Sequence, residues 1–108
     1  MTKKIIYNKL VRDKIPAIIQ ASGKDCETEI LSEEKYLPML DEKLDEEVAE
    51  YHKDQNIEEL ADILEVLYAV AKARGYSEEY LHHVRVEKRK KRGGFEERVL
   101  LKSVEEKE

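Results

Sequence analysis

The chain has 108 residues, of which 42% are charged and 41% hydrophobic, and its net charge is −5. This length predicts a single domain, residues 1–108, with a modest core, and the composition is typical of a folded helical protein. The negative charge argues against a nucleic-acid partner bound through bulk electrostatics, and no apolar run approaches the length of a membrane span. The single cysteine, Cys26, and the lack of a signal-like apolar region lead us to expect a cytoplasmic protein.

The first stretch, residues 1–14, is basic, with apolar residues between the charges. We expect an extended or irregular arm that leads into a helix near Pro16, because proline fits the first turn of a helix. Gly23 is expected to end that helix, as glycine commonly does. Lys9 and Arg12 are candidate phosphate contacts, although a basic arm that is simply solvated explains the same residues.

The next segment, residues 26–31, alternates weakly between polar and apolar side chains, which indicates a short strand. Ser32 is then expected to cap a helix. Pro38 lies inside this helical pattern, so a kink or a break is expected there. The pattern is compatible both with one helix that continues past Pro38 and with two.

The central stretch, residues 43–71, predicts two helices joined by a tight turn. In the first helix, apolar residues recur at steps of three and four, which gives one buried stripe. This stripe consists of Leu40, Leu44, Val48 and Tyr51. The second helix is expected to begin at Asn56, a good N-cap with Glu59 placed to complete a capping box, and to end at Gly75. It is apolar almost all round, which is typical of a central helix.

Acidic side chains gather on both sides of the turn. Glu47 and Glu50 lie three residues apart on the first helix, and Glu59 and Asp62 lie three apart on the second. If the turn centres on residues 54–55, these pairs face each other. Converging carboxylates suit Mg²⁺ or Mn²⁺, whereas zinc would require cysteine or histidine. A solvated acidic face is the alternative; Asp62 argues against it, because a carboxylate inside an apolar helix tends to find a cation.

A fourth helix is expected after Ser77, over residues 78–92, before Gly93. Its first turn is acidic and its last turn is basic, which matches the helix dipole at both ends. These cations can either contact a triphosphate or remain solvated. The candidates for phosphate binding are Lys88, Arg89 and Arg92.

Taken together, the segments predict an all-α fold with a four-helix bundle core. The tail after the last glycine is rich in valine and leucine and predicts a second strand. Residues 26–31 and 95–101 would then form a small two-stranded β element beside the helices, which needs their support because two strands alone are marginal.

The pattern Glu46-Glu47-x-x-Glu50 followed by Glu59-x-x-Asp62 resembles the EExxE…ExxD signature of the all-α nucleoside triphosphate pyrophosphohydrolases, the MazG-like superfamily. The flanking segments YNKLVRDKIP and RGGFEERVLL resemble a small MazG-like subfamily predicted to clear noncanonical nucleotides. The resemblance implies a MazG-like bundle, a homodimer or tetramer, and Mg²⁺-dependent cleavage of the α–β bond of a nucleoside triphosphate. It also implies that the metal ligands are Glu47, Glu50, Glu59 and Asp62, and that Glu46 is the base that positions the attacking water.

Two alternatives stay open. The first is the same chemistry on phosphoribosyl-ATP, in histidine biosynthesis. The second is a helical regulatory or interaction module whose acidic cluster does not catalyse. No base pocket can be predicted, because the chain has no tryptophan and Phe95 is its only aromatic residue besides the tyrosines and histidines.

Overall fold

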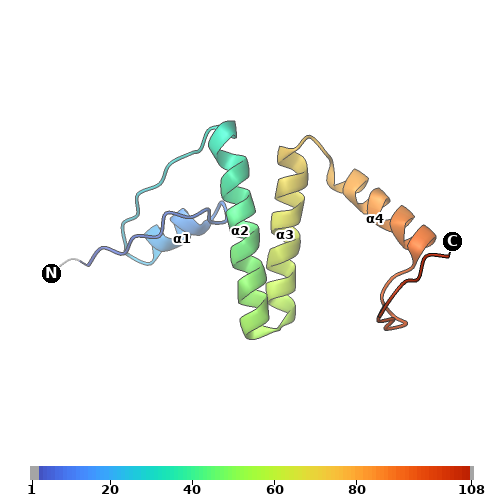
Figure 1. Ribbon diagram of the computed structural model, residues 1–108. Coiled ribbons are helices and arrows are strands. Elements are labelled where there is room, and N and C mark those ends of the chain that lie inside the picture. The colour runs from blue at the N-terminus through green and yellow to red at the C-terminus, as the bar shows by residue number, and fades with distance from the viewer. Residues whose placement is uncertain (1–2, 108) are drawn as a thin grey trace.

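A computed structural model describes residues 3–107 and shows an all-α chain (Figure 1). The four helices are α1 (Ile15–Ala21), α2 (Glu33–Asp54), α3 (Ile57–Ala73) and α4 (Glu78–Arg92). None of the described helices is both long enough and apolar enough to cross a membrane. The predicted all-α class is therefore confirmed, with all four expected helices present.

Helices α2 and α3 form an antiparallel hairpin, the main packed unit of the chain (Figure 1). The turn is tight because Gln55 adopts a left-handed conformation, with φ of 50°, and ends α2. Asn56 then caps α3: its side-chain oxygen accepts a hydrogen bond from the backbone N–H of Glu59 at 3.0 Å. This cap satisfies one of the free N–H groups in the first turn. The predicted N-cap is thus confirmed.

Pro38 does not interrupt α2, which runs unbroken from Glu33 to Asp54. A proline here removes the N–H that would bond to the carbonyl of Glu34. The position lies in the second turn, so only a short N-terminal segment of the helix depends on that bond. The expected break is absent, and the residues before and after Pro38 belong to one helix.

The ends of α3 and α4 follow the sequence signals. Gly75 has φ of +91°, and the N–H of Tyr76 donates to the carbonyl of Ala71 at 2.9 Å. This hydrogen bond, which spans the helix end, is the Schellman arrangement that glycine permits. Ser77 caps α4 by accepting the N–H of Tyr80 at 3.0 Å. Gly75 and Ser77 therefore act as the sequence predicts.

The expected β element is wrong. No strand occurs within residues 3–107. Residues 26–31 connect α1 to α2, whereas residues 95–101 follow α4 at the other side of the molecule (Figure 1). Ile30 and Phe95 are 96% and 95% exposed, so these apolar side chains are not packed against the helices. Two short segments without such support do not form a stable ladder.

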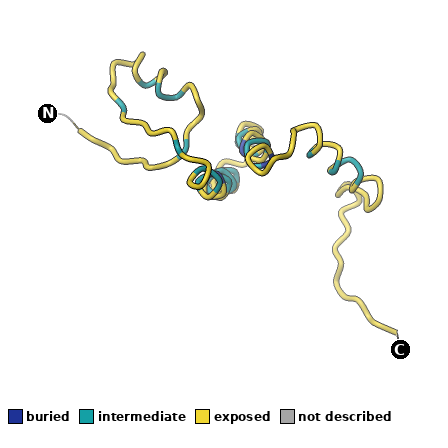
Figure 2. Tube along the Cα trace, turned by 90° about the horizontal axis from the view of Figure 1, so that it is seen from above, coloured by how far each residue is buried: buried dark blue, intermediate teal, exposed yellow. Residues whose placement is uncertain are grey.

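The chain is elongated and buries little. Its dimensions are 73 × 31 × 26 Å, and its radius of gyration is 19.4 Å. A compact domain of this length would have a radius of gyration of about 13 Å. Few residues are buried (Figure 2): the buried apolar residues are Leu40 on α2 and Val66 and Ala71 on α3. Helix α4 contacts α3 but extends away from the hairpin (Figure 1).

The side of α3 that α2 does not cover is apolar. Leu60, Leu64 and Leu67 repeat at helical spacing and are 45%, 46% and 38% exposed. A contiguous exposed apolar face of this kind commonly marks an interaction surface. The helix predicted to be central therefore has only part of its apolar surface covered by its own chain.

Candidate metal centre

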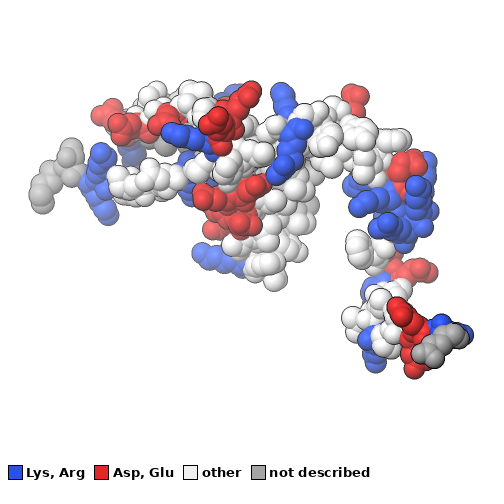
Figure 3. All heavy atoms as spheres, turned by 45° about the horizontal axis from the view of Figure 1, so that its top comes forward, with Lys and Arg blue, Asp and Glu red and all other residues white. Residues whose placement is uncertain are grey.

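The hairpin brings carboxylates from α2 and α3 together next to the turn. One oxygen from each of Glu47, Glu59 and Asp62 lies within 4.8 Å of the other two. A second group consists of oxygens of Glu50, Asp54 and Glu59, which also lie within 4.8 Å of one another. Acidic side chains are seen gathered over the hairpin in Figure 3. All four residues predicted as metal ligands therefore belong to one of two groups that share Glu59.

Glu59 is the side chain around which these negative charges are most crowded. It is half-buried and faces four other carboxylates, two in each group. Partial burial, followed by the negative charges of Asp54, Asp62, Glu50 and Glu47, raises the pKa of Glu59 above its ordinary value. Both effects disfavour the charged form of a carboxyl group. A cation bound at this point would relieve that repulsion.

Two of the clustered carboxylates already contact a cation of the chain. The guanidinium Nη2 of Arg12 lies 2.6 Å from Oδ1 of Asp62. Nζ of Lys43 lies 3.3 Å from Oε1 of Glu47, one turn away on α2. Within residues 3–107, no lysine or arginine forms an ion pair with the carboxylates of the second group. The second group therefore carries more uncompensated negative charge than the first.

Glu46 lies outside both groups. Nζ of Lys9 donates to its Oε1 at 2.8 Å, and Nζ of Lys43 approaches the same oxygen at 3.5 Å. The hydrogen bond from Lys9 is the main reason why the pKa of Glu46 lies below its ordinary value. Glu46 is thus held ionised and can accept a proton, but a lowered pKa makes it a weaker base. Its role as the base stays a prediction.

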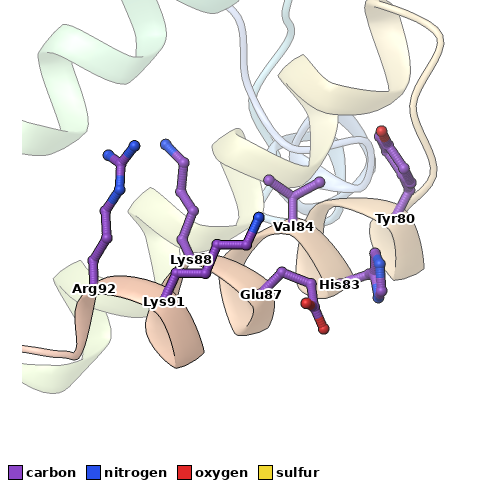
Figure 4. A pocket seen from close by; sticks show the side chains of 7 residues that line it. All are labelled: Tyr80, His83, Val84, Glu87, Lys88, Lys91 and Arg92. Carbon is purple, nitrogen blue, oxygen red and sulfur yellow. The ribbon is translucent and has the colours of Figure 1, made fainter.

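The predicted phosphate contacts fall in two separate places. Lys9 and Arg12, in the arm before α1, reach the acidic face of the hairpin. Lys88 and Arg92 extend from one face of α4, where they line a shallow hollow of about 370 Å³ (Figure 4). Arg89 pairs with Glu96. Because α4 runs away from the hairpin, the structure does not bring its cations to the carboxylates of the same chain (Figure 1).

Sequence reasoning missed two contributors to this site. Asp54 completes the second carboxylate group, and it lies four residues after Glu50, a spacing that places both on one face of a helix. Lys43 lies four residues before Glu47 and offsets its charge. Both spacings can be read from the sequence once the two helices are assigned.

The donor set fits a hard divalent cation. Every candidate ligand is a carboxylate oxygen, and Mg²⁺ and Mn²⁺ prefer such ligands. Oxygens bound to one Mg²⁺ at about 2.1 Å span up to about 4.2 Å. Groups whose oxygens lie within 4.8 Å of one another therefore need only small side-chain movements to share an ion.

Comparison with known proteins gives little beyond this geometry. A protein of Mycolicibacterium smegmatis, described as an uncharacterized protein, is 55% identical to the chain over 42 residues. The aligned segment covers 39% of this chain and 43% of that protein, so the chain spans less than half of that relative's length. No protein-family model matches the chain, and no solved structure matches it.

Proposed function

We propose that the chain is a Mg²⁺-dependent nucleotide pyrophosphohydrolase of the MazG-like kind. Its reaction would be hydrolysis of the α–β phosphate bond of a noncanonical nucleoside triphosphate, giving a monophosphate and pyrophosphate. The observation that carries the proposal is the convergence of carboxylates from two antiparallel helices, with Glu59 in both groups. This convergence is what the EExxE…ExxD resemblance leads one to expect.

The residues divide into three roles in this proposal. The ligands of the ion are four carboxylates of the two helices: Glu47, Glu50, Glu59 and Asp62. Asp54 is a further ligand on the same face. Mn²⁺ is the alternative to Mg²⁺. The ion would orient the phosphates and offset the charge that develops on them. Lys9 and Arg12 supply positive charge beside the carboxylates, where phosphate oxygens would bind. Glu46, held ionised by Lys9, accepts the proton of the attacking water.

The active form in this proposal is a homodimer or tetramer with a bundle core completed between chains. Leu60 and Leu64 are nearly half exposed on α3, and the radius of gyration of 19.4 Å exceeds that of a compact domain. A second chain that packs on this face would bury those leucines. The cations of α4 are remote from the carboxylates of their own chain. In an assembly, they would approach the carboxylates of another chain.

A non-catalytic helical module is the second candidate, and one observation favours it. Arg12 and Lys43 neutralise part of the first carboxylate group, as they would in a purely structural cluster. The second group argues the other way, because its three carboxylates have no such partner among the described residues. Phosphoribosyl-ATP is the alternative substrate for the same chemistry.

Pyrophosphate release tests the proposal. The purified chain is assayed with canonical and noncanonical nucleoside triphosphates and phosphoribosyl-ATP, each with Mg²⁺ and with EDTA. We expect Mg²⁺-dependent release that Glu50→Gln and Asp62→Asn abolish. Asp45→Asn is the matched control, because Asp45 is an exposed carboxylate of α2 outside both groups. Absence of release from every substrate would favour the non-catalytic module, and full activity in Asp62→Asn would end the assignment of that residue.

A further inference from the structure

The arm before α1 is tied to the acidic face of the hairpin by its charged side chains. Lys9 contacts Glu46 on α2, and Arg12 contacts Asp62 on α3. The arm itself contains no helix or strand over residues 3–14. Of its apolar residues, Leu10 is half-buried next to Met39 of α2, whereas Ile5, Ile6 and Tyr7 are 58%, 66% and 66% exposed. The arm is therefore held by one half-buried leucine and by two exposed ion pairs.

The Arg12 contact falls on a carboxylate that the proposed metal site needs. Asp62 Oδ1 receives the guanidinium at 2.6 Å, and another oxygen-bearing group of the same cluster, Glu59, lies within 4.8 Å. A divalent cation and a guanidinium that share this carboxylate repel each other and compete for its lone pairs. The arm thus places a positive charge where a bound ion would place a stronger one.

This contact is weak enough to be exchanged. The side chains of Arg12 and Asp62 are 57% and 37% exposed, so water competes for both. Exposed ion pairs contribute little to stability. A divalent cation bound by several carboxylates at once would outcompete a single guanidinium on one of them.

We propose that Arg12 is an internal counter-ion of Asp62, which a divalent cation displaces when it binds the hairpin carboxylates. In the metal-free chain, the guanidinium of Arg12 offsets the negative charge of Asp62 and so reduces the repulsion among the carboxylates of the first group. Metal binding releases the guanidinium, which then becomes available to phosphate oxygens. Metal loading and the phosphate-binding state of the arm are thereby coupled. This inference rests on the proposed function, since it requires the carboxylates to bind a metal.

Metal affinity is the first readout. Mg²⁺ and Mn²⁺ binding to the full chain is measured by isothermal titration calorimetry for wild type, Arg12→Ala and Lys4→Ala, with circular dichroism to verify folding. Removal of the competitor should tighten binding roughly two- to fivefold in Arg12→Ala, the range set by a weak exposed ion pair. Lys4→Ala removes the same charge from the same arm, where Lys4 forms no ion pair within the described residues, and should change affinity little.

Side-chain mobility in the wild type is the second readout and needs no variant. The heteronuclear NOE of the Arg12 Nε–Hε group should fall when saturating Mg²⁺ is added. Arg89, which pairs with Glu96 away from the hairpin, is the internal control and should not respond.

The outcomes separate the inference from the function that it rests on. Both readouts must move, because displacement changes affinity and mobility together. If the wild type binds Mg²⁺ while either the affinity of Arg12→Ala or the mobility of Arg12 stays unchanged, the counter-ion role is wrong and the metal site stands. If neither wild type nor Arg12→Ala binds Mg²⁺ or Mn²⁺, both the inference and the metal-dependent function fall. Binding by Arg12→Ala alone would show that the ion does not displace Arg12 in the wild type, and would overturn the inference.

Discussion

Asn56 caps α3 through the backbone N–H of Glu59, the residue whose carboxylate belongs to both acidic groups. The cap and the site thus depend on the same turn of helix. The N–H of Glu59 is satisfied at 3.0 Å by the Asn56 side chain, while its own side chain faces α2. A change at Asn56 should consequently disturb both helix stability and metal binding, although Asn56 is not a candidate ligand.

Asn56→Ala should lower the free energy of unfolding by about 1 kcal/mol, the usual loss when an N-cap is truncated. For a chain of this size, the melting temperature should fall by roughly 4–8 °C. Thermal unfolding at fixed protein concentration measures this. Asn56→Ser is the control, because serine is an equally good cap; it should melt close to wild type. Equal melting of Asn56→Ala and wild type would show that the cap contributes nothing.

Glu59 should make the metal-free chain less stable as pH rises. Its pKa in the folded chain is raised, mainly by partial burial and then by neighbouring carboxylates. Between the ordinary glutamate pKa and the raised one, the folded state holds more protons than the unfolded state. The free energy of unfolding therefore falls as pH increases through this window. Glu59→Gln should remove that slope and be the more stable protein at neutral pH.

Glu46 should act in the opposite direction. Its pKa is lowered, mainly by the hydrogen bond from Lys9, so its contribution is present above the ordinary glutamate pKa. That contribution is lost as pH falls through the lowered folded value. Urea unfolding of wild type, Glu59→Gln and Glu46→Gln from acidic to neutral pH checks both signs. Parallel curves for wild type and Glu59→Gln would contradict the crowding of charge at Glu59.

Local signals in the sequence predicted the helices well, because each is set by neighbours in the chain. Asn56, Gly75 and Ser77 act through hydrogen bonds within a few residues. The effect of Pro38 and the conformation of residues 26–31 were harder to predict, because both depend on what surrounds these residues in the fold. Ile30 in the first expected strand is 96% exposed and Phe95 in the second is 95% exposed, and the periodicity within a segment does not report such a lack of packing.

The carboxylate site was predictable to the extent that the turn fixes the register of two helices. Once the turn is centred on residues 54–55, facing positions on α2 and α3 follow from helix geometry. The contact between Arg12 and Asp62 was not predictable, because 50 residues separate the two and the arm has no periodic structure. Long-range contacts of an irregular segment carry no local signal.

Divalent cations should stabilise the chain beyond any effect of ionic strength. An ion that binds only the folded state at a hundredfold excess over Kd adds about 2.7 kcal/mol. This corresponds to a rise in melting temperature on the order of 10 °C. Melting curves in MgCl₂, MnCl₂ and NaCl of matched ionic strength test this. The rise should be much smaller in Glu59→Gln, and identical wild-type curves in the three salts would rule out the site.

Loss of the exposed leucines on α3 should break the proposed assembly. Leu64 is 46% exposed on the face of α3 that α2 leaves uncovered, next to Leu60 and Leu67. Leu64→Glu would place a charge at the centre of this apolar face, and a buried unpaired charge is costly at an interface. We expect wild type to be at least a dimer at micromolar concentration and Leu64→Glu to be a monomer, as measured by light scattering coupled to size-exclusion chromatography.

Ile30→Glu is the matched control for Leu64→Glu. Ile30 is 96% exposed but lies in the connection between α1 and α2, away from the apolar face of α3. The same change of side chain at this position should leave the dimer intact. A monomeric wild type would overturn the assembly itself, whereas dissociation by Ile30→Glu but not by Leu64→Glu would move the interface away from α3. Retention of the dimer in both variants would mean that the α3 leucines do not form it.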